Sequence, residues 1–221
     1  MLKFWSDDPK SLIREGAGYW RYVPTKDGVR FFTSYDYRVR FGVLGRVFDA
    51  FVFRPLMGWA TAWSFDRLRQ WIEKGIDPAL SLQRSLIHLV ARGALAFVWL
   101  YQGLVPKLLV QHADELTMIQ QGGISATTAP LAVQAFGWIE VVFGLGMLLF
   151  FHHRWYFRFT IVAMICATVG VAIYSTQFLV AAFNPVSLNV LMAALALVGL
   201  LASRDLPSAS RCLRKQPKGG T

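Results

Sequence analysis

The chain has 221 residues, of which 55% are hydrophobic and only 16% are charged. Soluble domains carry about 25% charged residues, so this composition argues against a soluble enzyme, a disordered chain or a disulfide scaffold, and it indicates a membrane protein. The 23 Lys and Arg residues exceed the 13 Asp and Glu residues and give a net charge of +10. The basic residues form no run of five or more like charges, which argues against a nucleic-acid-binding arm.

The first 16 residues contain no continuous apolar stretch of signal-peptide length. We therefore expect no cleaved secretory signal, and we expect the first membrane span to act as the insertion signal. Residues 17–24 and 29–41 are rich in Tyr, Phe and Val and flank the turn at 25–28. This pattern predicts a β-hairpin over 17–41, within a cytoplasmic leader that covers residues 1–84.

A helix is expected from about residue 46 to residue 74, and the sequence Arg54-Pro55 should kink or divide it. Large apolar residues recur on it at helical spacing. The helix either packs on the hairpin or lies on the inner leaflet with its tryptophans at headgroup depth, and both interpretations stay open. The residues of the candidate membrane-surface helix are Phe48, Leu56, Trp59 and Trp63.

Four apolar stretches reach the length of about 20 residues that a bilayer requires, at 86–105, 130–151, 155–177 and 185–202. Lipid supplies no hydrogen bonds, so each span should be a helix. Asn184 followed by Pro185 is typical of a helix start. The predicted fold class is an all-α membrane protein. It consists of an antiparallel four-transmembrane-helix bundle over 85–203, with a small cytoplasmic β-hairpin and an amphipathic helix at the N-terminus.

The distribution of Lys and Arg predicts the orientation of the bundle. Residues 1–84 hold 14 of these residues, the loop after the first span holds one, and the loop before Asn184 holds none. The tail at 204–221 holds five. The positive-inside rule then places both termini in the cytoplasm, which agrees with an even number of spans.

Polar residues inside the spans are the strongest candidates for function, because a charge at the bilayer centre costs about 2.5–3.5 kcal/mol unless it pairs or lines a cavity. Glu140 lies near the middle of the second span on a glycine-lined face, and Arg92 lies on a polar stripe of the first span. The reach of an arginine allows these two residues to pair. The predicted intramembrane polar site consists of Arg92, Gln102, Lys107, Glu140 and Asn189.

This polar site has two interpretations. It is either an ion pair that fixes the register of the helices, or a site for a proton-coupled or quinone-like ligand. Adjacent His152 and His153 diverge by about 100° on a helix and do not clasp one metal ion easily. No zinc-ligand spacing, phosphate loop or nucleophile motif is present, so the catalytic residues are unknown and no metal is expected.

Several segments together resemble the DoxX-like family of small bacterial four-helix membrane proteins. They are Arg92-Gly93, YQGLVPKL at 101–108, GWIE at 137–140, NPVSLN at 184–189 and the tail at 204–214. Relatives in that family are linked to membrane redox chemistry, including a quinone-reducing thiosulfate oxidation complex. Others occur beside or fused to nucleotide-dependent oxidoreductases. The resemblance implies an accessory or quinone-proximal role and supports Arg92, Lys107 and Glu140 as family-type polar positions.

The leader resembles a different protein class. Residues 28–41, Gly45-Arg46, Asp49 and 53–56 look like the last strands and the C-terminal helix of a START-like helix-grip domain, which encloses a lipophilic ligand. Only about 80 residues precede the first span and most of the sheet is missing, so the fragment is interpreted as a docking platform.

The resulting functional hypothesis is an accessory or docking subunit of a membrane redox system in the bacterial inner membrane, without catalytic activity of its own. Its expected partners are the lipid bilayer, a larger membrane complex or redox enzyme, and further copies of itself. A bound quinone or lipid is the one cofactor considered. The alternatives are a quinone-linked oxidoreductase component that acts through Glu140 and Arg92, and a transporter of a small lipophile.

Overall fold

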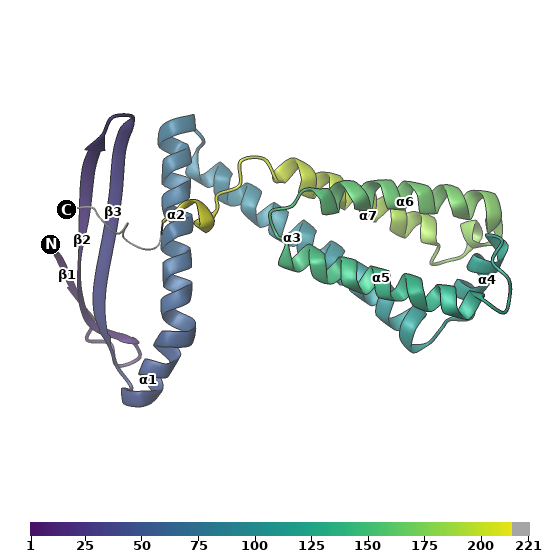
Figure 1. Ribbon diagram of the computed structural model, residues 1–221, viewed down its shortest axis with the longest axis horizontal. Coiled ribbons are helices and arrows are strands. Elements are labelled where there is room, and N and C mark those ends of the chain that lie inside the picture. Colours follow the sequence, from purple (N-terminus) through teal and green to yellow (C-terminus); the bar gives the residue numbers. More distant parts are fainter. Residues whose placement is uncertain (214–221) are drawn as a thin grey trace. The chain divides into compact units, whose positions relative to one another are not determined.

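The computed structural model describes residues 1–213. The chain forms two compact units, which are described separately. One contains Met1–Asp66 with the described residues from Ser208 onward, and the other contains Arg67–Pro207 (Figure 1). The part of the predicted basic tail from position 214 onward lies outside the described residues.

The N-terminal unit contains an antiparallel sheet with the strand order β1 (Leu2–Trp5), β2 (Ile13–Thr25) and β3 (Gly28–Val39). Thr25 pairs with Gly28 across a tight turn, as the predicted hairpin requires. The hairpin begins earlier than expected, at Ile13, and the sequence analysis missed strand β1. Strand β1 is too short for an alternation of apolar and polar residues to predict it from the sequence.

The helical part of this unit begins at Gly42 instead of residue 46 and has three segments, the last of which continues past Asp66 into the bundle unit. These are α1 (Gly42–Phe48), the π-helical η1 (Asp49–Phe53) and α2 (Arg54–Lys74). The backbone N–H of Arg54 donates to the carbonyl of Asp49, five residues earlier. The division therefore falls directly before Pro55, which lacks a backbone N–H, as the sequence predicted.

The bundle unit contains α3 (Pro78–Gln102), which continues as η2 (Gly103–Leu109), and also α5 (Ala129–Leu149), α6 (Trp155–Tyr174) and α7 (Pro185–Ala202). Within residues 1–213, these four helices are long and apolar enough to cross a membrane. The helix that contains the first predicted span, 86–105, begins earlier than that span. The side chain of Asp77 accepts hydrogen bonds from the N–H groups of Ala79 and Leu80 and starts the helix at Pro78.

Two short elements complete the loops of the bundle, α4 (Ala113–Gln121) and η3 (Thr176–Val180), and η4 (Ala209–Arg211) follows in the N-terminal unit. The amphipathic α4 was not predicted. In α7, the side chain of Asn184 accepts from the N–H of Ser187 at 2.8 Å, which confirms the predicted helix start.

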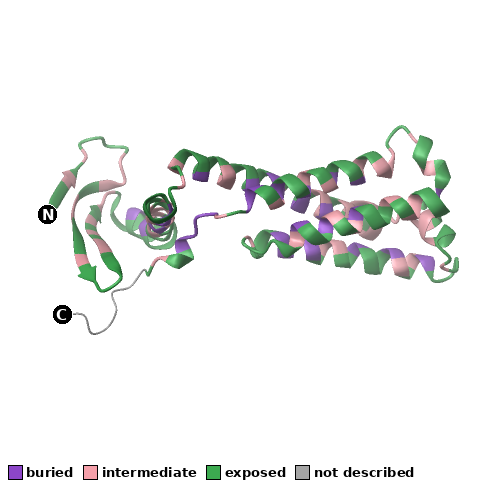
Figure 2. Cartoon of the chain, turned by 90° about the horizontal axis from the view of Figure 1, so that it is seen from above, coloured by how far each residue is buried: buried purple, intermediate pink, exposed green. Residues whose placement is uncertain are grey.

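The core of the bundle forms where α3 packs against α5 and α7, and α6 packs against α7. Its buried apolar residues include Leu95, Ala96, Trp99, Phe143, Met147, Phe157 and Ala196. The indole N–H of Trp99 donates to the hydroxyl of Thr160 at 3.2 Å. Most other large apolar residues of the four helices face outward (Figure 2). Outward-facing apolar side chains are expected of helices that are surrounded by lipid.

Candidate functional site

Arg92 lies on α3 and is only 1% exposed. Its guanidinium donates to the carbonyl of Met147 through Nε, to the carbonyl of Phe150 at 2.6 Å and to the carbonyl of His153 at 3.4 Å. A helix leaves its last four carbonyls without an internal partner. Arg92 therefore caps the C-terminal end of α5 and supplies a cation where the helix dipole favours one.

Aromatic rings enclose this guanidinium. Its central carbon lies 5.4–5.5 Å from the ring centroids of Phe151, Tyr156 and Phe157. His88, one turn earlier on α3, is also buried, and its ring contacts Phe151 edge-on with centroids 4.7 Å apart. Arginine stacks well on aromatic faces and is weakly hydrated, so this surrounding suits a buried guanidinium.

Arg92 and Glu140, which the reach of an arginine would allow to pair, have different partners. The first carbonyl that Arg92 contacts belongs to Met147, seven residues after Glu140, which is about 10 Å along an α-helix. Glu140 instead pairs with Lys107, with Nζ and Oε2 3.1 Å apart. Helical periodicity predicted the inward faces of both side chains, but it does not fix the height at which neighbouring helices meet.

Lys107 is the centre of a second group of buried charges, and we call Lys107, Glu115 and Glu140 the Lys107 cluster. The ammonium of Lys107 lies 3.3 Å from a carboxylate oxygen of Glu115 and donates to the carbonyl of Gln102 at 3.3 Å. The three charged side chains are between 12% and 19% exposed. One ammonium thus neutralises only one of two largely buried carboxylates, so the cluster carries a net charge of −1 when all three groups are ionised.

Close approach of two backbones positions the Lys107 cluster. A Cβ atom at Gly103 would lie 2.6 Å from the carbonyl oxygen of Gly137 and 2.9 Å from the Cβ of Glu140. Only glycine allows this contact between η2 and α5. The contact brings Lys107, one turn beyond Gly103, within reach of the Glu140 carboxylate.

Glu115 was missed because it lies in α4, which the sequence analysis read as a loop. The segment did carry a signal. The Nδ1 atom of His112 accepts from the N–H of Asp114, and Asp114 and Glu115 occupy the first helical turn, where acidic residues are favoured. Asn189 is buried on α7. Among the described residues no hydrogen bond joins Asn189 to Arg92 or to the Lys107 cluster.

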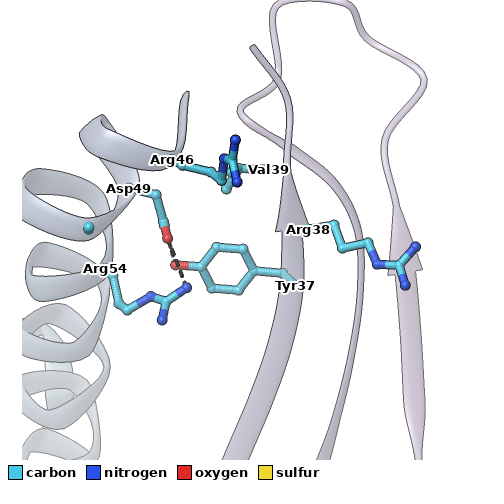
Figure 3. A pocket seen from close by; sticks show the side chains of 7 residues that line it. Tyr37, Arg38, Val39, Arg46, Asp49 and Arg54 are labelled. Atoms are coloured by element: carbon cyan, nitrogen blue, oxygen red, sulfur yellow. Dashed lines mark hydrogen bonds and ion pairs between the residues drawn. The ribbon is translucent and has the colours of Figure 1, made fainter. Parts of the chain in front are cut away.

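The N-terminal unit holds a cavity of about 520 Å³ between the end of β3 and the η1 region. The hydroxyl of Tyr37 donates to Asp49 Oδ1 at 2.5 Å, and Arg54 pairs with Asp49 Oδ2 at 2.9 Å (Figure 3). Burial and the hydrogen bond to Asp49 raise the pKa of Tyr37 above its usual value of about 10. Arg46 also lines this cavity, whereas the side chain of Arg38 points away from it.

The four residues of the candidate membrane-surface helix do not share one environment. Phe48, Leu56 and Trp59 are exposed, and Trp63 is half-buried and stacks on Trp59 with ring centroids 6.2 Å apart. Contact of these residues with a membrane stays a prediction. In the part of the chain that the structure describes, no group of three or more His, Cys, Asp or Glu residues could hold a metal ion.

The chain is thus a membrane protein with four apolar helices and two separate sites of buried charge, Arg92 and the Lys107 cluster. Residues 96–197 match the sequence profile of the DoxX-like family. Over 103 residues the chain is 46% identical to an uncharacterized membrane protein, YndG, of Bacillus subtilis (strain 168). That match covers 46% of the chain and 38% of the relative. No solved structure matches this chain.

These comparisons support the resemblance to the DoxX-like family over 96–197, a segment that includes the Lys107 cluster and begins just after Arg92. The chain spans well under half of the relative's length, so the relative assigns no function to it. The resemblance of the N-terminal segment to a START-like domain stays a prediction.

Proposed function

We propose that this chain is a DoxX-like accessory subunit of a membrane redox system in the bacterial inner membrane, and that it docks a partner enzyme without catalysing a reaction itself. The observation that carries the proposal is the environment of Arg92. Each of its three nitrogens donates to a carbonyl of the chain itself, and aromatic rings enclose the group. A buried cation used in this way holds α3 and α5 together, which supports a structural role for Arg92 over a catalytic one.

The N-terminal unit offers a surface for the partner. Trp20 pairs with Thr33 and Tyr22 pairs with Phe31 across the sheet. Trp20 and Tyr22 therefore lie on the same face of the sheet as Phe31. The ring of Phe31 contacts Phe65 of α2, but Trp20 and Tyr22 are 67% and 63% exposed. Exposed tryptophan and tyrosine side chains are typical anchors of protein interfaces.

The membrane context completes the proposal. Both termini lie in the cytoplasm, as the distribution of Lys and Arg predicts, so the N-terminal unit meets its partner on that side. A cysteine-labelling experiment on intact cells and on inverted vesicles tests the orientation. Labels at the two ends that react from opposite sides of the membrane would contradict it.

The docking function is tested by affinity purification of the full chain in mild detergent, followed by identification of bound proteins and extracted quinones and lipids. We expect a redox enzyme to co-purify with the wild type and to be lost from the Trp20→Ala/Tyr22→Ala double variant. Trp138→Ala is the matched control, because Trp138 is equally exposed but lies on α5. Migration of the wild type as a free monomer, or equal loss from both variants, would contradict the proposal.

A second candidate is direct participation in quinone chemistry, and the Lys107 cluster favours it. Its unneutralised carboxylate could hold a proton next to a quinone-like ligand. In this case Glu140→Gln abolishes a quinone-linked activity while the protein still inserts and folds. Unchanged activity would exclude the idea. A lipophile transporter is less well supported, because the sequence has no inverted repeats.

A further inference from the structure

The end of the N-terminal unit formed by residues 41–53, which we call the tip, exposes an unusual density of apolar side chains. Leu44 is 81% exposed and Phe51 is 79% exposed. The other exposed large apolar residues of the tip are Phe41, Val43, Val47, Phe48 and Val52. Water is a poor solvent for a contiguous patch of this kind, and such patches usually mark an interaction surface.

The tip is braced by the rest of the unit. A Cβ atom at Gly45 would clash with the carbonyl oxygen of Arg40, so α1 packs directly on the backbone that follows β3. The Tyr37 hydroxyl and the Arg54 guanidinium hold Asp49, which is 4% exposed, at the base of the tip. The apolar side chains therefore point outward from a fixed platform.

Basic residues flank and interrupt this patch in the sequence. The segment 38–54 contains four arginines and one acidic residue, which gives a net charge of +3. Three of the arginines have partners in the chain. Arg38 pairs with Glu15, Arg40 donates to the carbonyls of Ser6 and Asp8, and Arg54 pairs with Asp49. The fourth is Arg46, which is exposed and lines the cavity beside Arg54, and no ion pair to it occurs within residues 1–213.

From these features we infer that the tip is a docking surface for an anionic lipid bilayer, with its apolar side chains among the lipid headgroups and a lipid phosphate at Arg46. An apolar patch with a basic border matches the order of groups at a bilayer surface, where phosphates lie above hydrocarbon. The chain is itself a membrane protein, and α2 and residues 75–77 tether the tip to the first span. This inference does not depend on the proposed function.

The test uses the full chain in nanodiscs of phosphatidylcholine alone or mixed with phosphatidylglycerol. Cys166→Ala and Cys212→Ser remove the native thiols, and the serine can keep the hydrogen bond that Cys212 donates to the carbonyl of Ala62. A nitroxide at Phe51→Cys reports its depth through collisions with oxygen and with a water-soluble nickel complex. A nitroxide at Asp27→Cys, in the turn at the opposite end of β3, is the matched control.

In discs that contain phosphatidylglycerol, we expect the label at position 51 to collide more often with oxygen than with the nickel complex. The label at position 27 should stay in water. Arg46→Glu should abolish this preference, whereas Arg30→Glu, which reverses a charge far from the tip, should leave it unchanged. Added inorganic phosphate should not move the label at position 51 out of the bilayer.

Three results would overturn the inference. The first is a label at position 51 that is equally exposed to water in both lipids. The second is displacement by free phosphate, which would indicate a site for a soluble anion. The third is a nitroxide at position 51 that is immobilised in detergent and regains mobility when the protein is diluted, which would show that a second copy of the chain covers the tip.

Discussion

Replacing Arg92 by methionine keeps most of the side-chain volume but removes the cap from the end of α5. The carbonyls of Met147 and Phe150 each lose a short hydrogen bond from a charged donor, and the carbonyl of His153 loses a long one. Hydrogen bonds to charged groups contribute about 1.5–3 kcal/mol each, so two close ones correspond to about 3–6 kcal/mol. Methionine also avoids the cost of burying a charge, and we therefore expect a loss at the lower end of this range, about 3 kcal/mol.

The free energy of unfolding can be measured by adding sodium dodecyl sulfate to the protein in mild detergent micelles and following helicity by circular dichroism. Arg158→Met is the matched control, because Arg158 is exposed on α6. We expect it to change the stability by less than about 0.5 kcal/mol. An Arg92→Met protein within 1 kcal/mol of the wild type (about fivefold in the unfolding equilibrium) would refute the assignment of Arg92 as a helix cap.

Two further predictions concern the other charged groups of the bundle unit. Lys107→Met leaves two buried carboxylates without a cation and should destabilise the protein by about 3 kcal/mol, and adding Glu140→Gln should recover part of this loss in the same unfolding assay. The hydrogen bond from Lys74 lowers the pKa of Asp205 below its usual value, so the pair stabilises the protein above about pH 4 and the gain is lost as the pH falls through the lowered pKa. Because both side chains are partly exposed, the stability gap between the wild type and Asp205→Asn should stay below about 1 kcal/mol at pH 7 and close on acidification.

The apolar helices could be predicted from the sequence because lipid leaves few alternatives to a helix. The start of α7 followed from Asn184-Pro185, and the same kind of signal, Asp77-Pro78, stands at the start of α3. The structure shows that Asp77 caps α3, so this helix begins eight residues before the predicted span. Local capping chemistry was therefore present in the sequence at both positions.

The pairing of the buried charges could not be predicted in the same way. Periodicity places Arg92 and Glu140 on inward faces, but the partner of each depends on how far one helix is shifted along the next. Arg92 binds backbone carbonyls. Every residue carries a carbonyl, so no sequence pattern indicates which ones an arginine will bind. The Lys107 cluster depends on the contact between Gly103 and Gly137, which is visible only when both helices are placed.

The cap on α5 also bears on how the chain is made. When α3 emerges from the ribosome, the carbonyls that later satisfy Arg92 have not yet been synthesised, since they follow it by 55 residues or more. A charged arginine is costly to insert on an isolated span, by up to about 2.5–3.5 kcal/mol at the bilayer centre. The first two spans therefore gain from entering the bilayer together as a hairpin, in which the second helix brings the acceptors that the first one needs.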